Sequence, residues 1–124
     1  MHLWIKLGGI LGGLSVMLGA FGAHSLKASL TEKSLATFQT GVQYQFMHSL
    51  ALILVGILML SLSEESNKRL NRSGWFFAVG ILLFSGSLYS LALGGPRWLG
   101  PVTPLGGLCF IIGWFTLAYR FLRK

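Results

Sequence analysis

Acidic residues are nearly absent from this sequence of 124 residues. It contains no aspartate, and its three glutamates, Glu32, Glu64 and Glu65, stand outside the long apolar stretches. Charged residues make up 10% of the chain, whereas a soluble domain has about 25%. Carriers of protons or cations usually place an acid inside the bilayer, so the lack of one argues against that class of transporter.

Cysteine and catalytic motifs are just as scarce. The single cysteine, Cys109, excludes an intramolecular disulfide and offers no metal-binding spacing, so we expect it to pack as a small hydrophobe. The chain has no HExxH motif, no glycine-rich phosphate loop and no organised nucleophile–base pair. These absences predict a protein that is not an enzyme and that holds no cofactor or metal.

Hydrophobic residues, in contrast, account for 53% of the chain and come in blocks. Four blocks, at about residues 3–23, 42–62, 74–93 and 103–121, reach the roughly 20 residues that a membrane-spanning helix needs. Backbone polar groups in a bilayer must bond within their own segment, so these blocks predict helices. We therefore expect an all-α polytopic membrane protein, in which residues 1–124 form a single domain, a compact bundle of four transmembrane helices.

The ends of these blocks carry further signals. The length of the first block, and the three spans that follow it, favour an uncleaved span over a signal peptide. Ser29 and Glu32 have the spacing of a capping box, which predicts that the second helix begins near Leu30. Thr103 followed by Pro104 predicts an N-cap and first turn for the last helix.

The cations are divided unevenly between the two predicted sides, and the net charge is +7. The side with both termini holds Lys6, Lys68, Arg69, Arg72, Arg120, Arg123 and Lys124, and the other side holds Lys27, Lys33 and Arg97. Such a bias predicts that both termini face the cytoplasm. The cations flank spans rather than forming a stripe, so we expect the lipid bilayer, and no nucleic acid, as partner.

Small residues recur every three or four positions in the first block. They are Gly8, Gly12, Ser15, Gly19 and Gly22. In lipid, close backbone approach favours helix association more than hydrophobicity does, so this stripe predicts a tight helix–helix seam. Gly106 and Gly113, one heptad apart in the last block, are the expected partner face.

Polar residues enter the second apolar block through the stretch FQTGVQYQFMHSL, residues Phe38 to Leu50. His48 lies a turn or more inside and needs a partner there. The segments GAFGAHSLK and GGPRWLGPVTP bring further polar groups to the same, outer side. We predict one polar cluster under the outer surface, made of His24, Gln43, Tyr44, His48, Arg97 and Thr103.

This polar cluster has three interpretations. Its members bond to one another and close the outer end of the bundle, which is the outcome we expect. Alternatively, they form a ligand or ion site. As a third reading, His24 and His48 ligate a metal or haem, although nothing else in the sequence marks a porphyrin pocket.

Three motifs, GAFGAHSLK, ATFQTGVQYQFMHSLALILVG and GPVTPLGG, are similar to those of a known family. With them, the whole chain resembles the small uncharacterised bacterial inner-membrane proteins of the YgdD/YwdK type, a domain-of-unknown-function family with a relative in animal mitochondria. The resemblance implies four spans in the bacterial inner membrane. It implies no activity, and it leaves the role of the signature residues His24, Gln39, Gln43, Tyr44 and His48 open.

The sequence is compatible with more than one function. We expect an accessory protein that stabilises or assembles a membrane complex, with a membrane-protein partner or a second copy of itself. The alternative is a small homo-oligomeric channel or carrier for an anion or a neutral solute, which enters at the outer polar cluster. A third hypothesis, a lipid- or quinone-handling enzyme with His48 as a base, has the least support.

Overall fold

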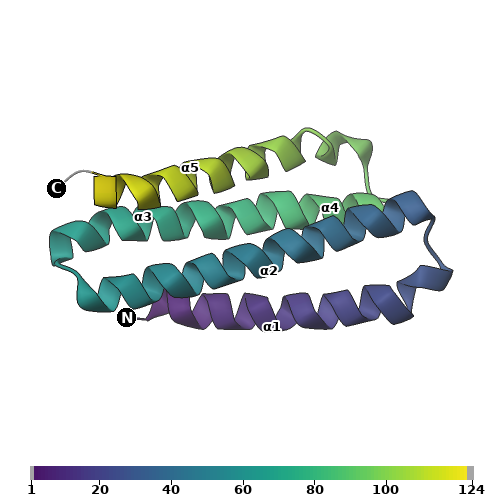
Figure 1. Ribbon diagram of the computed structural model, residues 1–124. Coiled ribbons are helices and arrows are strands. Elements are labelled where there is room, and N and C mark those ends of the chain that lie inside the picture. The colour runs from purple at the N-terminus through teal and green to yellow at the C-terminus, as the bar shows by residue number, and fades with distance from the viewer. Residues whose placement is uncertain (1, 123–124) are drawn as a thin grey trace.

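Helices make up nearly all of the protein. The computed structural model describes residues 2–122, except for the side chains of Glu65 and Arg120; Arg123 and Lys124, used in the charge count above, lie outside the described residues. The elements are α1 (Leu3–His24), η1 (Leu26–Ala28), α2 (Glu32–Ser61), α3 (Glu64–Gly80), η2 (Ile81–Ser85), α4 (Gly86–Ala92), η3 (Arg97–Leu99) and α5 (Val102–Leu122) (Figure 1). Since α3, η2 and α4 form one continuous rod, four rods result, and each is long and apolar enough to cross a membrane. The predicted all-α fold with four transmembrane segments is confirmed.

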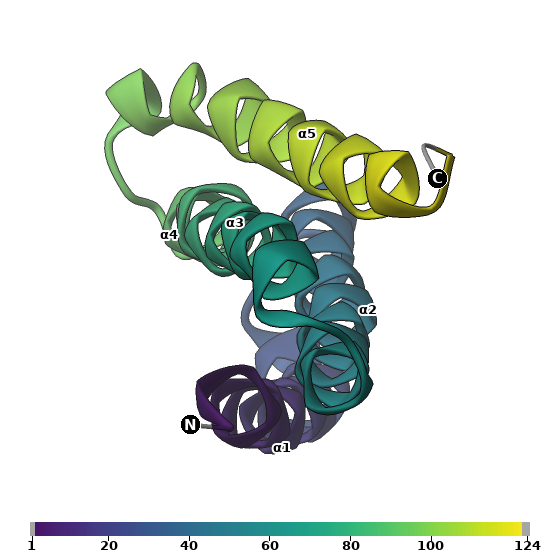
Figure 2. The ribbon, with the colours of Figure 1, turned by 90° about the vertical axis from the view of Figure 1, so that its left-hand side faces the viewer.

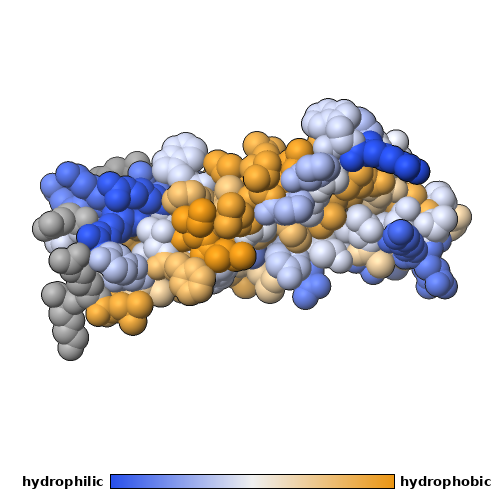
Figure 3. Space-filling view, turned by 90° about the horizontal axis from the view of Figure 1, so that it is seen from above, coloured by the Kyte–Doolittle hydropathy of each residue, from blue (hydrophilic) through white to orange (hydrophobic). Residues whose placement is uncertain are grey.

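The four rods run up and down between two ends of the molecule. Both termini and the α2–α3 connection lie at one end, which we call the terminal end, while η1 and η3 lie at the other, the distal end (Figure 1). Helix α2 has 30 residues, or about 45 Å, so its ends project beyond a hydrocarbon core of about 30 Å. The view onto α5 shows a largely apolar central band between more polar ends (Figure 3).

The second helix begins differently from the prediction. Helix α2 starts at Glu32, and its N-cap is Thr31, whose side chain accepts a hydrogen bond of 3.1 Å from the Ser34 backbone N–H. The prediction of a capping box made by Ser29 and Glu32 is therefore wrong. Ser29 instead closes η1, because its N–H donates to the Leu26 carbonyl.

The predicted start of the last helix is also displaced. Helix α5 begins at Val102, so Thr103 and Pro104 lie within its first turn rather than at its boundary. The Thr103 hydroxyl bonds to the Ser87 hydroxyl, which is a tertiary contact between α5 and α4.

The rods pack in the order of the chain. Helix α1 packs on α2, α2 packs on the rod of α3, η2 and α4, and α5 packs on α3 and η2. Helices α1 and α5 consequently lie on opposite sides of the molecule (Figure 2). The bundle is thus open between α1 and the rod that contains α4.

The small-residue stripe of α1 forms the predicted tight seam, but its partner is α2. A Cβ atom built on Gly8 would lie 2.6 Å from the Ser49 carbonyl oxygen, and one on Gly22 would lie 3.0 Å from the Phe38 ring. Ser15 in the same stripe is buried. The expectation that Gly106 and Gly113 face this stripe is wrong, because α5 packs on the far side of the molecule.

Gly106 and Gly113 serve a second seam, between α5 and the α3–η2 rod. A Cβ on Gly113 would lie 2.8 Å from the Phe77 ring, and one on Gly106 would collide with the backbone of Phe84. The reverse pairing also occurs, because Phe110 of α5 packs directly against Gly80 at the end of α3. Glycines and phenylalanines thus interlock at three positions of this contact.

Candidate functional site

His48, the deepest polar residue predicted from the sequence, lies in an aromatic cluster between α2, α3 and α5. The side chain is 3% exposed. Its ring stacks on Phe110 with centroids 3.6 Å apart and planes 8° apart. Phe77 and Trp114 lie against its other sides. Because aromatic side chains enclose it, His48 belongs to the core of the bundle rather than to its surface.

Both ring nitrogens of His48 are occupied. Trp114 donates its indole N–H to Nε2 over 3.0 Å, and Nδ1 lies 2.8 Å from the Tyr44 carbonyl oxygen. An indole nitrogen can only donate and a carbonyl can only accept, so Nε2 carries the lone pair and Nδ1 carries the proton. This arrangement describes a neutral imidazole with no nitrogen left for a substrate proton or a metal ion.

Removing the donor to His48 should therefore have a modest cost. In Trp114→Phe, the Nε2 lone pair would stay buried without a donor, and we expect the free energy of unfolding to fall by about 1 kcal/mol. Trp98→Phe is the matched control, because Trp98 is exposed in η3. Thermal unfolding in a mild detergent measures both variants, and an equal shift in the two would contradict the assignment.

His24 does not approach His48. Gly22 packs against Phe38, which precedes His48 by ten residues on α2. His24 therefore lies about 15 Å or more along the helix axis from His48, and it is exposed at the end of α1. The hypothesis of a metal or haem held by these two histidines is wrong for this arrangement.

The remaining members of the predicted cluster are also dispersed. Gln43 points away from the bundle and is exposed, while Tyr44 is half-buried against Phe84. Arg97 and Thr103 line a hollow at the distal end. Of the six residues, only Tyr44 contacts His48, and Arg97 and Thr103 share the hollow at the distal end. They do not form one cluster, because helix register puts His48 near the middle of α2 rather than at its outer end.

A polar network that the sequence analysis did not assemble joins three helices at mid-depth. Gln45, which is 4% exposed, donates its amide N–H to the Leu11 carbonyl over 2.8 Å. It accepts a bond of 2.6 Å from the Tyr89 hydroxyl. Beside it, Ser85 donates to the Gly41 carbonyl over 2.7 Å. One glutamine therefore ties α1, α2 and α4 together.

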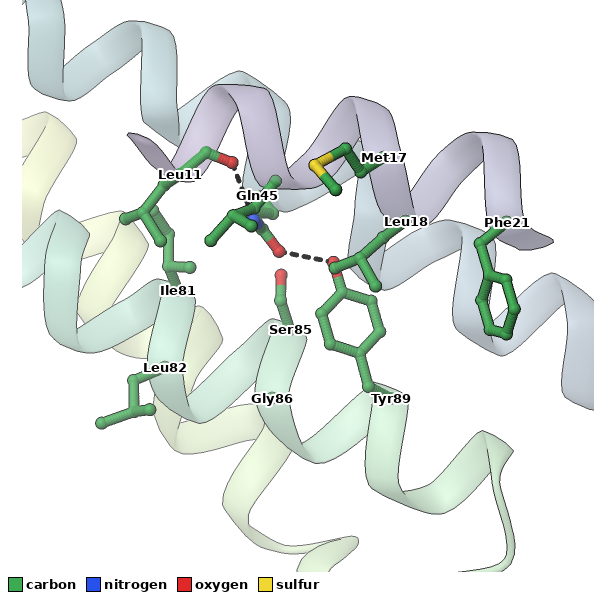
Figure 4. A pocket seen from close by; sticks show the side chains of 11 residues that line it. Leu11, Met17, Leu18, Phe21, Gln45, Ile81, Leu82, Ser85, Gly86 and Tyr89 are labelled. Atoms are coloured by element: carbon green, nitrogen blue, oxygen red, sulfur yellow. Dashed lines mark hydrogen bonds between the residues drawn. The ribbon is translucent and has the colours of Figure 1, made fainter. Parts of the chain in front are cut away.

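The network depends on a change of helical pitch. Residues Ile81–Ser85 form a π-helical turn between α3 and α4. A π turn holds an extra residue and rotates the helix that follows it, and such turns are frequent at functional sites. Here it directs Ser85 toward Gly41 and leaves Tyr89 opposite Gln45 (Figure 4).

The Gln45 network forms the floor of a lateral groove of about 520 Å³ between α1 and the η2–α4 segment. Apolar side chains make the two walls, with Leu11, Leu14, Met17, Leu18 and Phe21 on α1 and Ile81 and Leu82 on η2 (Figure 4). Gly86 lies at the floor, and a Cβ atom built on it would have no other atom within 4 Å. The groove is the strongest candidate for a functional site, because it combines an open apolar cleft with a fixed polar base.

Some of these floor residues carried a signal in the sequence. Gln45 stood in the polar stretch before the second apolar block, on the face that it shares with Ser49. Ser85 and Tyr89 lay in an apolar block without any marker, and their role follows from the π turn. The network was missed because its partners come from segments that no local pattern connects.

Comparison with known sequences identifies the family. A sequence profile described as "Protein of unknown function (DUF423)" matches residues 18–107. The chain belongs to this family. The matched stretch contains the floor residues Gln45, Ser85 and Tyr89 as well as His48.

Similar proteins support the assignment to the DUF423 family over nearly the full length. A UPF0382 membrane protein of Staphylococcus haemolyticus is 44% identical over 117 residues, which is 94% of this chain and 93% of the relative. The UPF0382 membrane protein YwdK of Bacillus subtilis is 44% identical over 117 residues, 94% of each chain. One from Haemophilus influenzae is 41% identical over 116 residues, 94% of this chain and 90% of the relative. No solved structure matches.

The resemblance drawn from the sequence motifs is thus confirmed. This DUF423 protein is an integral membrane protein, since its relatives are named membrane proteins and four of its helical rods can span a bilayer. The family description gives no activity.

Proposed function

We propose that the protein is an accessory protein of the bacterial inner (plasma) membrane, not an enzyme, with both termini in the cytoplasm. It stabilises or assembles a membrane complex by receiving one transmembrane helix of a partner protein in the lateral groove. The distribution of Lys and Arg between the two ends supports the orientation. The lateral groove supports the proposed binding of a partner helix.

The observation that carries the proposal is the open space between α1 and the η2–α4 segment. Leu14, Met17, Phe21 and Leu82 line it, yet they are exposed. In a bilayer, helices associate through close packing rather than through hydrophobicity. An apolar cleft with a glycine at its floor offers such packing, because the backbone of an incoming helix can approach Gly86.

The polar floor adds recognition to this packing. Tyr89 donates its proton to Gln45, so its oxygen keeps the capacity to accept a hydrogen bond. A Ser, Thr or Asn on the partner helix could donate to this oxygen, and such bonds contribute about 1 kcal/mol in membranes. From Leu11 to Phe21 the groove is ten residues long, or about 15 Å, which is enough for about three turns of a partner helix.

Filling the groove should prevent partner binding without unfolding the protein. In Gly86→Leu, the new side chain would enter the groove from an open position. A photo-crosslinking residue at Met17, on the groove wall, should capture one partner of defined size in cells, and Gly86→Leu should reduce this adduct by about tenfold. Mass spectrometry of the adduct identifies the partner, whose own abundance should fall in cells that lack this protein.

Two matched controls belong to this experiment. Gly13→Leu adds the same side chain at another open position, outside the groove. A crosslinker at Val16 lies at the depth of Met17 but does not line the groove. Adducts from Met17 that contain only lipid, or that persist in Gly86→Leu, would refute the proposal. Adducts with a second copy of the chain would show that the groove binds another copy of this protein rather than a different protein.

A further inference from the structure

The distal end carries a second hollow, of about 700 Å³, which is separate from the lateral groove. We call it the distal hollow. It lies between the start of α2, the end of α4, η3 and the start of α5, and it is lined by Lys33, Ser34, Thr37, Leu88, Leu91, Ala92, Arg97, Gly100, Thr103 and Pro104. Its volume is within the range of small-ligand sites. The interaction role proposed above does not use it.

The charge of the distal hollow has one sign. Lys33 and Arg97 bring cations from two different elements, and no carboxylate lines the hollow. Neither cation forms an ion pair with any residue in the described part of the chain. Two unpaired cations facing one space favour an anion there, and the guanidinium of Arg97 suits the paired oxygens of a phosphate.

The hydroxyl groups that line the hollow differ in whether they already have a hydrogen-bond partner. The Thr37 hydroxyl donates to the Lys33 carbonyl, and that of Thr103 is paired with Ser87. The Ser34 hydroxyl has no partner among the described residues. It can therefore act as a donor for an anion beside Lys33. The first turns of α2 and α5 adjoin the hollow and add partial positive charge.

The polarity of the hollow changes with depth. Arg97 lies in the connection between α4 and α5, and Lys33 lies in the first turn of α2, so both cations are at the membrane surface. Leu88, on α4, lies one turn below Ala92, where that helix ends. Leu88 and Leu91 therefore form an apolar wall that continues into the bilayer. A charged rim above an apolar wall fits an amphiphile better than a free ion.

We infer that the distal hollow binds an anionic phospholipid. Lys33, Arg97 and Ser34 hold its phosphate and headgroup, and the first methylenes of one acyl chain lie along Leu88 and Leu91. The lipid bridges α2 and the α4–α5 connection. The phosphate could also come from the free ion, and the experiment separates these two sources.

The test measures lipid retention by the purified, full-length protein in a neutral detergent, with native mass spectrometry. We expect phosphatidylglycerol to be retained about tenfold more strongly than phosphatidylcholine with the same acyl chains. The double variant Lys33→Gln/Arg97→Gln should lose this difference. Both side chains are exposed, so the variant should keep the thermal unfolding profile of the unmodified protein in lipid-free detergent.

Three further arms make the result decisive. Lys27→Gln removes a cation from the same end, outside the hollow, and should leave retention unchanged. Thr37→Leu fills the hollow without changing the charge and should weaken retention. Inorganic phosphate at millimolar concentration should not displace the lipid. An equal loss of lipid retention in Lys27→Gln would show diffuse attraction of the lipid to the charged surface. Full retention in Thr37→Leu would exclude the hollow as the binding site, and displacement of the lipid by phosphate would show a site for the free anion. Each of these outcomes overturns the inference.

Discussion

Gly106→Ala should destabilise the bundle by about 3 kcal/mol, whereas Gly107→Ala, one residue later, should have almost no effect. A Cβ on Gly106 would collide with the backbone nitrogen and Cα of Phe84 in the π turn. A backbone cannot rotate out of the way as a side chain can, so α5 would have to move away from η2. Overpacking of this kind typically costs 1–3 kcal/mol, and occasionally more.

Gly107 is a close control because it lies on the same turn of α5. A Cβ there would lie 3.8 Å from the Phe84 ring, which is an ordinary van der Waals contact. The free energy of unfolding is measured by titration with a denaturing detergent, followed by circular dichroism. If both variants unfolded at the same detergent fraction, the close seam between α5 and η2 would be incorrect.

Gln45→Leu should destabilise the protein by about 2 kcal/mol. The substitution keeps most of the side-chain volume but removes the acceptor for the Tyr89 hydroxyl and the donor to the Leu11 carbonyl. A fully buried hydroxyl without a partner costs about 1–3 kcal/mol, and the half-buried Tyr89 hydroxyl costs the lower part of this range. Hydrogen bonds between transmembrane helices contribute up to about 2 kcal/mol. The same detergent titration measures the loss.

A control and a rescue accompany this prediction. Gln43→Leu changes an exposed glutamine on the same helix and should leave stability unchanged. In Gln45→Leu/Tyr89→Phe the orphaned hydroxyl is gone, so we expect the double variant to recover part of the loss. Additive effects of the two substitutions would show that the Tyr89–Gln45 bond contributes nothing.

The four spans could be predicted from the sequence because each is a long apolar block, and the tight seam because small residues follow helical spacing. The seam's partner could not be predicted. Gly8 and Gly12 pack against Ser49, but a spacing pattern says only that a helix has a close neighbour. It does not say which of three other helices that neighbour is.

The predicted polar cluster failed for a related reason. Placing His24, His48 and Arg97 together assumed that residues near the same predicted boundary lie at the same depth. Packing instead sets Phe38 opposite Gly22, which puts His48 at mid-depth. The Tyr89–Gln45 bond depends on the π turn at Ile81–Ser85, and no local residue pattern marks such a turn.

The order in which the helices pack has a consequence for biosynthesis. Each rod after the first packs against the rod that precedes it in the chain, so each newly made span finds a partner already in the membrane. Assembly can follow translation from the N-terminus without waiting for the last helix, and contacts between neighbours in sequence favour fast folding. The side of α1 that α2 leaves uncovered is then exposed from the first moment of insertion, long before α4 exists.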